Sequence, residues 1–297
     1  MTAVAPPPAA PSTATSPSQQ DRRRSMFAPR WFTYVVLGIA VLMSAFPLYW
    51  MFVVGSNDTS AINDVPPRLL PGGNFGSLSE QVFDATPFGR ALLNTFIVAS
   101  LVAAGQVLFS TMAGFAFAKL RFPGREVLLV LVILTMMIPP QLGVIPLFIL
   151  MSDLGWANTL QAVIAPSVVS AFGVFWMRQL IDGTVPDELI EAAKLDGAST
   201  FRIYRSVVVP LIRSGAAVLG LFAFMFAWND FFWPLIVLSD PDSHTVQVAL
   251  RQLQNQAYTT DFGVQMAGTF IATVPLLLIF VLLGRQIVAG VMEGALK

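Results

Sequence analysis

The sequence has 297 residues, of which 55% are hydrophobic and only 11% are charged, and its 17 Lys and Arg balance 17 Asp and Glu. Soluble domains carry about 25% charged residues, so this composition indicates a membrane protein. The chain has no cysteine, which excludes a disulfide framework, a thiolate metal site and a Cys nucleophile. The only histidine, His244, cannot form a metal cluster alone, and we expect it to be a solvated loop residue.

Residues 1–25 are rich in Pro, Ala, Ser and Thr and end in a basic run. This stretch has too little apolar surface to offset its chain entropy, so we expect a disordered cytoplasmic segment. We do not expect a secretory signal, because no apolar h-region is present in it. The remainder, residues 26–297, is predicted to form one membrane domain.

Six apolar stretches approach the roughly 20 residues that a helix needs to cross a bilayer. They are residues 32–54, 91–118, 127–150, 161–177, 214–238 and 267–283. We therefore predict an all-α integral membrane protein with six transmembrane helices.

The loop charges predict the orientation. With the N-terminus inside, 14 of the 17 Lys and Arg residues fall on the inner side. Only Arg68, Arg90 and Arg251 fall outside. The positive-inside rule therefore places both termini in the cytoplasm.

Two adjacent prolines, Pro139 and Pro140, lie near the middle of the predicted third span. They remove backbone donors and predict a kink there. Backbone freed at membrane depth needs protein or a water-filled cavity around it. The kink either lines a pathway or only improves packing, and the sequence leaves both interpretations open.

The most charged cytoplasmic loop, residues 181–213, separates the fourth and fifth predicted spans. Pro186 suits the first position of a short helix, and Gly197 suits its left-handed end. Ser199 or Thr200 would then cap a second short helix. Leu189, Ala192, Ala193 and Asp196 share one small, weakly apolar face of the first helix. This face fits either a groove on a soluble partner or an ordinary connector on the membrane surface.

The predicted fifth span carries a polar pair, Asn229 and Asp230, between Trp228 and Trp233. An acid within a span is costly and usually faces the bundle interior or water. These four residues could line a route for hydroxyl-rich substrates. Alternatively, Asp230 accepts a hydrogen bond from a neighbouring helix and only holds the bundle together.

At this point the sequence resembles a known family, the permease subunits of binding-protein-dependent ABC importers of the maltose-transporter type. The loop is similar to the EAA loop of these importers, and four other elements are similar to conserved runs in the same order. The five similar elements are Glu191-Ala192-Ala193 with Asp196-Gly197-Ala198 and Pro210-Leu211 in the loop, residues 137–147, residues 172–179, residues 228–235 and the tail 290–297. The resemblance covers nearly everything after residue 25, although Asp230 stands where Glu is commoner.

The resemblance implies a type I importer fold in a prokaryotic inner membrane and a role in importing a sugar or oligosaccharide. Glu191, Ala192, Ala193, Asp196 and Gly197 would contact a separate cytoplasmic ATPase. It further implies a second homologous permease, an ATPase dimer, and an extracytoplasmic substrate-binding protein. The chain lacks a phosphate-binding Gly-x-x-x-x-Gly-Lys-Ser/Thr loop, so we expect no catalysis and no cofactor here, with ATP and Mg on the partner.

We also consider three other functions for this sequence. An ABC permease for another polar solute, such as a peptide or an amino acid, would share the EAA loop. An ion-coupled secondary transporter would carry paired intramembrane acids or inverted repeats, and the spans show one acid and no clear repeat. An intramembrane enzyme would need a convergent nucleophile and base, which this sequence does not offer.

Overall fold

The computed structural model describes residues 31–58, 65–254 and 261–295, with the side chains of the last helix as far as Leu282. The segment predicted to be disordered, residues 1–25, lies outside the described residues, and so do the side chains of the tail 290–297. The chain divides into two compact units at residues 49 and 50, and each unit is described by itself. The described part of the first unit is the bulk of one helix with exposed apolar side chains.

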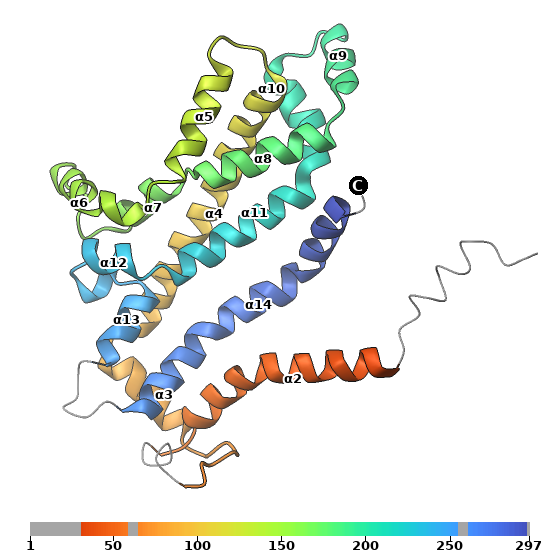
Figure 1. Ribbon diagram of the computed structural model, residues 1–297. Coiled ribbons are helices and arrows are strands. Elements are labelled where there is room, and N and C mark those ends of the chain that lie inside the picture. Colours follow the sequence, from red (N-terminus) through yellow and green to blue (C-terminus); the bar gives the residue numbers. More distant parts are fainter. Residues whose placement is uncertain (1–30, 59–64, 255–260, 296–297) are drawn as a thin grey trace, which may run out of the picture. The chain divides into compact units, whose positions relative to one another are not determined.

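The described residues form helices and connecting loops, with no strand among them, and this confirms the predicted all-α class (Figure 1). The elements are α2 (Trp31–Val54), α3 (Phe75–Ala85), α4 (Phe88–Lys119), α5 (Arg125–Thr135), η2 (Pro140–Gly143), α6 (Val144–Asp153), α7 (Leu160–Ser167), α8 (Ala171–Thr184), α9 (Asp187–Leu195), α10 (Thr200–Ile203), the π-helical turn η3 (Tyr204–Val208), α11 (Val209–Asn229), α12 (Phe232–Val237), η4 (Pro241–Ser243), α13 (Val246–Leu253) and α14 (Phe262–Ala295).

Five helices in the described residues are long and apolar enough to cross a membrane, and a bent helix pair makes a sixth candidate span. The bent pair is the predicted third span, which we expected to be a single kinked helix. It is instead broken, with α5 and residues 140–153 meeting at 91°. Pro139 has an extended backbone (φ −58°, ψ 126°) because Pro140 follows it and disfavours the helical conformation.

The fifth span also differs from its predicted bounds, 214–238. Its helical region begins at Thr200 and ends at Asn229, and the short helix α12 follows after a break. Pro234 explains the break, because a proline cannot donate to the carbonyl four residues earlier, which here belongs to Asp230. Asp230 therefore lies between two helices and not within one, contrary to our expectation.

Small residues bring α4 and α8 into close contact along the centre of the second unit. A Cβ atom at Gly114 would lie 2.8 Å from both the backbone nitrogen of Arg178 and the Cβ atom of Met177. A Cβ atom at Gly105 would lie 2.8 Å from that of Val168, which follows α7 and precedes α8. Close backbone approach through glycine is a common way for membrane helices to pack.

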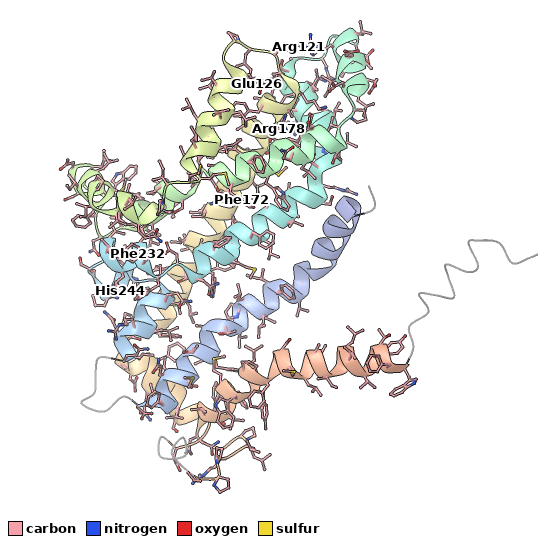
Figure 2. All side chains as sticks on the ribbon, in the orientation of Figure 1. Arg121, Glu126, Phe172, Arg178, Phe232 and His244 are labelled. Atoms are coloured by element: carbon pink, nitrogen blue, oxygen red, sulfur yellow. The ribbon has the colours of Figure 1, made fainter. Side chains whose placement is uncertain are left out.

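The two ends of the second unit differ in chemistry. Figure 2 shows Arg121, Glu126 and Arg178 at one end, whereas Phe232 and His244 lie toward the other. This arrangement agrees with the predicted cytoplasmic side. His244 is not solvated as we expected, since only 5% of it is exposed. Its backbone carbonyl accepts a hydrogen bond from Asn94 Nδ2 at 3.0 Å, which ties this loop to α4 and buries the ring.

Candidate functional site

The end of the second unit that the sequence predicts to be cytoplasmic holds the loop of residues 181–213, hereafter the coupling loop after its expected role, and its helix α9 (Figure 1). Helix α9 begins at Asp187, so Pro186 precedes the first helical residue and does not occupy it. Ile190 is 3% exposed and belongs to a buried cluster with Val185, Ile203 and Tyr204. Ile190 is the only buried residue of α9, and it packs this helix against the cluster.

The end of α9 has the geometry that the sequence indicates. Gly197 adopts a left-handed backbone (φ 76°), and its N–H donates to the Lys194 carbonyl at 3.0 Å. The Ala198 N–H donates to the Ala193 carbonyl, also at 3.0 Å. These two bonds form a Schellman motif. Ser199 then caps α10 by accepting a hydrogen bond from the Arg202 N–H.

The predicted docking residues of α9 do not share a single environment. Glu191, Ala192, Asp196 and Gly197 are exposed, whereas Ala193 is partly buried and packs on the core cluster. The predicted face is therefore divided between the protein's own core and the surface.

Two large apolar side chains that the sequence analysis missed extend the exposed surface of the coupling loop. Leu195 is 89% exposed at the end of α9, and Phe201 is 63% exposed on α10. Exposed apolar side chains beside a charged loop are typical of a contact surface. The signal available in the sequence was an apolar residue on each side of the turn at Gly197.

Lys119, the last residue of α4, connects that helix directly to the start of α9. Its Nζ atom donates to Asp187 Oδ1 at 2.6 Å, and its side chain is 5% exposed whereas that of Asp187 is 76% exposed. The hydrogen bond from Lys119, and then its positive charge, lower the pKa of the Asp187 carboxyl below its ordinary value. Sequence reasoning missed this pair, because 68 residues separate its members.

A second connection joins the coupling loop to α4 through the π-helical turn η3. The hydroxyl of Tyr204 lies 2.7 Å from Thr111 Oγ1, and the pair is buried. Single π turns interrupt a regular helix and are frequent at functional sites. Helix α4 is thus linked to both halves of the coupling loop.

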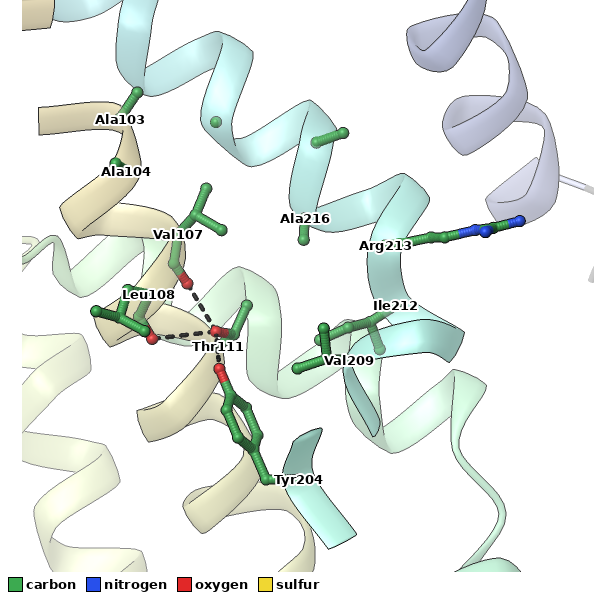
Figure 3. Close-up of a pocket in the computed structure, with 12 residues that line it drawn as sticks. Ala103, Ala104, Val107, Leu108, Thr111, Tyr204, Val209, Ile212, Arg213 and Ala216 are labelled. Carbon is green, nitrogen blue, oxygen red and sulfur yellow. Dashed lines mark hydrogen bonds between the residues drawn. The ribbon is translucent and has the colours of Figure 1, made fainter. Parts of the chain in front are cut away.

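A groove lies between α4 and α11 beside this hydroxyl pair, with a volume of about 530 Å³ (Figure 3). Its wall is mainly apolar, with alanines on both helices, and Thr111 and Tyr204 lie together at one side. The dashed lines in Figure 3 mark the contacts of Thr111 with Tyr204 and with the carbonyls of Val107 and Leu108. Arg213 is the one charged residue in the described lining of the groove.

A larger hollow of about 670 Å³ lies farther along the same two helices, and we call it the pathway cavity. Its polar lining residues are Gln106, Gln141, Ser167, Asn229 and Asp230. The rest of its described lining is Val98, Val102, Pro140, Val163, Ala223, Phe226, Ala227, Phe231 and Phe232. The break at the third span therefore contributes Pro140 and Gln141 to the lining of this cavity.

The four residues predicted for the substrate route fall into two pairs. Asn229 and Asp230 line the pathway cavity, whereas Trp228 and Trp233 are not among its lining residues. The indole N–H of Trp228 donates to the Ala272 carbonyl at 3.3 Å, and that of Trp233 donates to the Ala162 carbonyl at 2.9 Å. Both rings are buried, so their observed role is packing between helices.

Comparison with known proteins gives a consistent result. Residues 106–292 match the family described as the binding-protein-dependent transport system inner membrane component. The sn-glycerol-3-phosphate transport system permease protein UgpE of Brucella abortus (strain 2308) is 32% identical over 270 residues, covering 88% of this chain and 95% of that protein. The lactose transport system permease protein LacG of Rhizobium radiobacter is 35% identical over 264 residues, covering 89% and 95%.

The chain is also similar to a solved structure. A chain of a bacterial ABC transporter involved in the import of the acidic polysaccharide alginate superimposes with a TM-score of 0.74 at 23% identity. The superposition covers 90% of this chain and 98% of that one. At this identity the match supports a shared permease fold.

Proposed function

The chain belongs to the family of binding-protein-dependent transport system inner membrane components, and from this we infer that it builds half of the translocation pathway for a sugar or oligosaccharide. It is a multi-pass inner-membrane subunit of an ABC importer. The observation that carries the proposal is the pathway cavity, where amide, hydroxyl and carboxyl groups gather between apolar helices. Such groups can exchange hydrogen bonds with a hydroxyl-rich solute that has left water.

The names of the relatives support a polar, hydroxylated substrate. One relative is named for sn-glycerol-3-phosphate and another for lactose. Both solutes carry hydroxyl groups, and the polar lining of the pathway cavity suits such groups. We therefore assign the sugar class to this chain as a proposal.

The coupling loop is proposed to bind a separate cytoplasmic ATPase. Its contact residues would be Glu191, Ala192, Ala193, Asp196 and Gly197, with Ala193 supporting the contact from its partly buried position. Movement of α9 would reach the cavity-lining helices through Lys119 and Tyr204, which join the loop to α4. In this scheme ATP and Mg bind the partner, and this chain binds no cofactor and performs no catalysis.

The proposed assembly contains three further components. A second homologous permease would complete the pathway, an ATPase dimer would bind the cytoplasmic side, and an extracytoplasmic protein would deliver the substrate. The exposed apolar surfaces of α5 and α6 are compatible with contacts to lipid or to the second permease.

Uptake of a labelled sugar panel in cells with and without this gene tests the proposal. We expect at least one neutral mono- or oligosaccharide to lose uptake on deletion and to regain it when the full chain is supplied. Normal uptake of every sugar after deletion would contradict the proposed substrate class.

A further inference from the structure

The pathway cavity carries one acidic group and, among its described lining residues, no Lys, Arg or His. We propose that this cavity discriminates against anionic solutes and that Asp230 is the residue responsible. The substrate class would then be neutral, hydroxyl-rich solutes and not those that carry phosphate or carboxylate. This inference rests on the proposed function and narrows it.

The break between α11 and α12 places Asp230 at the cavity. Asp230 is the C-cap residue of α11, and only Phe231 separates it from the first residue of α12. It is one of the residues that line the cavity.

The neighbouring polar groups match hydroxyl groups in both directions. Asn229 Nδ2 donates to the Met225 carbonyl at 2.8 Å, and Gln106 Nε2 donates to the Ser167 carbonyl at 2.8 Å. Each amide retains a carbonyl oxygen as an acceptor and a second N–H as a donor. A sugar hydroxyl can donate to these oxygens or to Asp230 and can accept from the remaining N–H groups.

A phosphate or carboxylate group does not match these donors and acceptors as a hydroxyl group does. Its oxygens are acceptors, and protein sites that bind such groups use Arg, Lys or clustered backbone N–H donors. The cavity presents Asp230 in place of a cation, between apolar residues such as Val98 and Val102, which weaken dielectric screening. The relative named for sn-glycerol-3-phosphate handles an anion, so we expect this chain to differ from it in substrate charge.

The absence of cysteine allows a direct test of the local field. Gln141→Cys places a single thiol of this chain in the cavity lining. The full transporter in membranes is treated with methanethiosulfonate reagents of similar size that carry a trimethylammonium or a sulfonate group. Modification of this chain is followed by mass shift, and each rate is normalised to that of a free thiol. We expect the cationic reagent to be favoured by about tenfold, as a nearby weakly screened charge implies.

Substitutions at Asp230 test whether this residue causes the preference for the cationic reagent. Asp230→Asn keeps a side chain of the same size but removes the charge, so the ratio of the two normalised modification rates should fall toward one. Asp230→Glu should retain the preference. Asp153→Asn makes the same change outside the cavity lining and should have no effect. The proposal is overturned if the preference for the cationic reagent is absent or if it survives Asp230→Asn. A neutral reagent of the same size checks that the cavity remains open.

Transport separates this inference from the proposed function. Cells with the whole transporter are supplied with labelled lactose, a wider panel of neutral sugars and sn-glycerol-3-phosphate. Uptake of sn-glycerol-3-phosphate as fast as that of the best neutral sugar would overturn the inference and leave the importer function intact. Uptake of no sugar, together with an Asp230-dependent reagent preference, would instead overturn the proposed substrate class alone.

Discussion

Lys119 and Asp187 join the cytoplasmic end of α4 to the first turn of α9 by an ion pair whose Nζ and Oδ1 atoms are 2.6 Å apart. The two partners differ greatly in exposure, because the Lys119 side chain is buried and that of Asp187 is exposed. The pair therefore leaves Asp187 accessible while it holds the buried ammonium in place. A displacement of α9 away from α4 would break this contact.

We predict that Lys119→Met and Asp187→Asn each slow uptake by less than about fivefold, the usual range for an ion pair with one exposed partner. The double variant should be no slower than the worse single variant, because both changes remove the same contact. Initial uptake rates of the four proteins give this comparison. Fully additive losses would show that the two residues act separately.

The same pair predicts a pH dependence of stability. The pKa of Asp187 is lowered in the folded protein, so its stabilising contribution is complete above the ordinary value of 3.8 and is lost as the pH falls through the folded value. We expect the difference in thermal stability between the wild-type protein and Lys119→Met to be constant from about pH 5 to 7, because the Asp187 carboxyl is ionised there in both the folded and the unfolded state, and to shrink below that range. Melting curves of the solubilised transporter measure this difference.

Gly197 gives a prediction that separates backbone conformation from side-chain volume. No atom lies within 4 Å of a Cβ built there, yet its φ of 76° is unfavourable for other residues. Gly197→Ala should destabilise the end of α9 by about 1 kcal/mol, whereas Gly197→Asn should be tolerated better, because Asn accepts this conformation. Gly197→Asp adds a charge at the proposed contact. We expect it to insert in the membrane but to lose the ATPase in a pull-down, and an undiminished complex with normal uptake would contradict this role.

Ile190 and Leu195 lie on the same short helix but have opposite surroundings, since Ile190 is 3% exposed and Leu195 is 89% exposed. Ile190→Ala should lower the unfolding free energy by about 2–5 kcal/mol, because it leaves a cavity in the core cluster. Leu195→Ala should leave the melting temperature unchanged and weaken ATPase binding. Melting and pull-down measured on both variants distinguish anchor from contact, and a stability loss in Leu195→Ala would contradict this division.

The local features of the coupling loop could be predicted from sequence because they depend on neighbouring residues. Gly197 ends a helix and Ser199 begins one because of their own conformational and hydrogen-bonding preferences, which only nearby residues affect. The same holds for the apolar spans and for the charge bias that orients them. The break at Asp230 was missed although its cause is also local, because hydropathy continues through Pro234 while the proline interrupts the helix.

The site residues were harder to predict, because adjacent residues of one sequence run face different surroundings. Trp228 is buried against α14, while its neighbour Asn229 lines the pathway cavity. The cavity also takes Gln106 and Gln141 from other helices, and no local pattern marks either residue. Long-range packing determines which polar residues lie together, so the lining of the pathway cavity could not be predicted from the sequence.

The final prediction concerns the buried hydroxyl pair that joins η3 to α4. Tyr204→Phe removes one hydrogen bond with little change in shape, while Thr111 keeps the Val107 carbonyl as an acceptor at 2.7 Å. We expect a stability loss of about 1 kcal/mol, the usual net value of one such bond. Thr111→Val removes the same bond and the bond to Val107, so it should cost more than Tyr204→Phe.

The Tyr204→Phe variant separates a structural role from a role in coupling. If the pair transmits movement from the coupling loop, transport per ATP hydrolysed should fall in Tyr204→Phe at a temperature well below its melting point. Measurement of both rates in proteoliposomes provides this ratio. If the ratio is unchanged while the melting temperature falls, the pair stabilises the π turn and the signal must reach α4 through Lys119 alone.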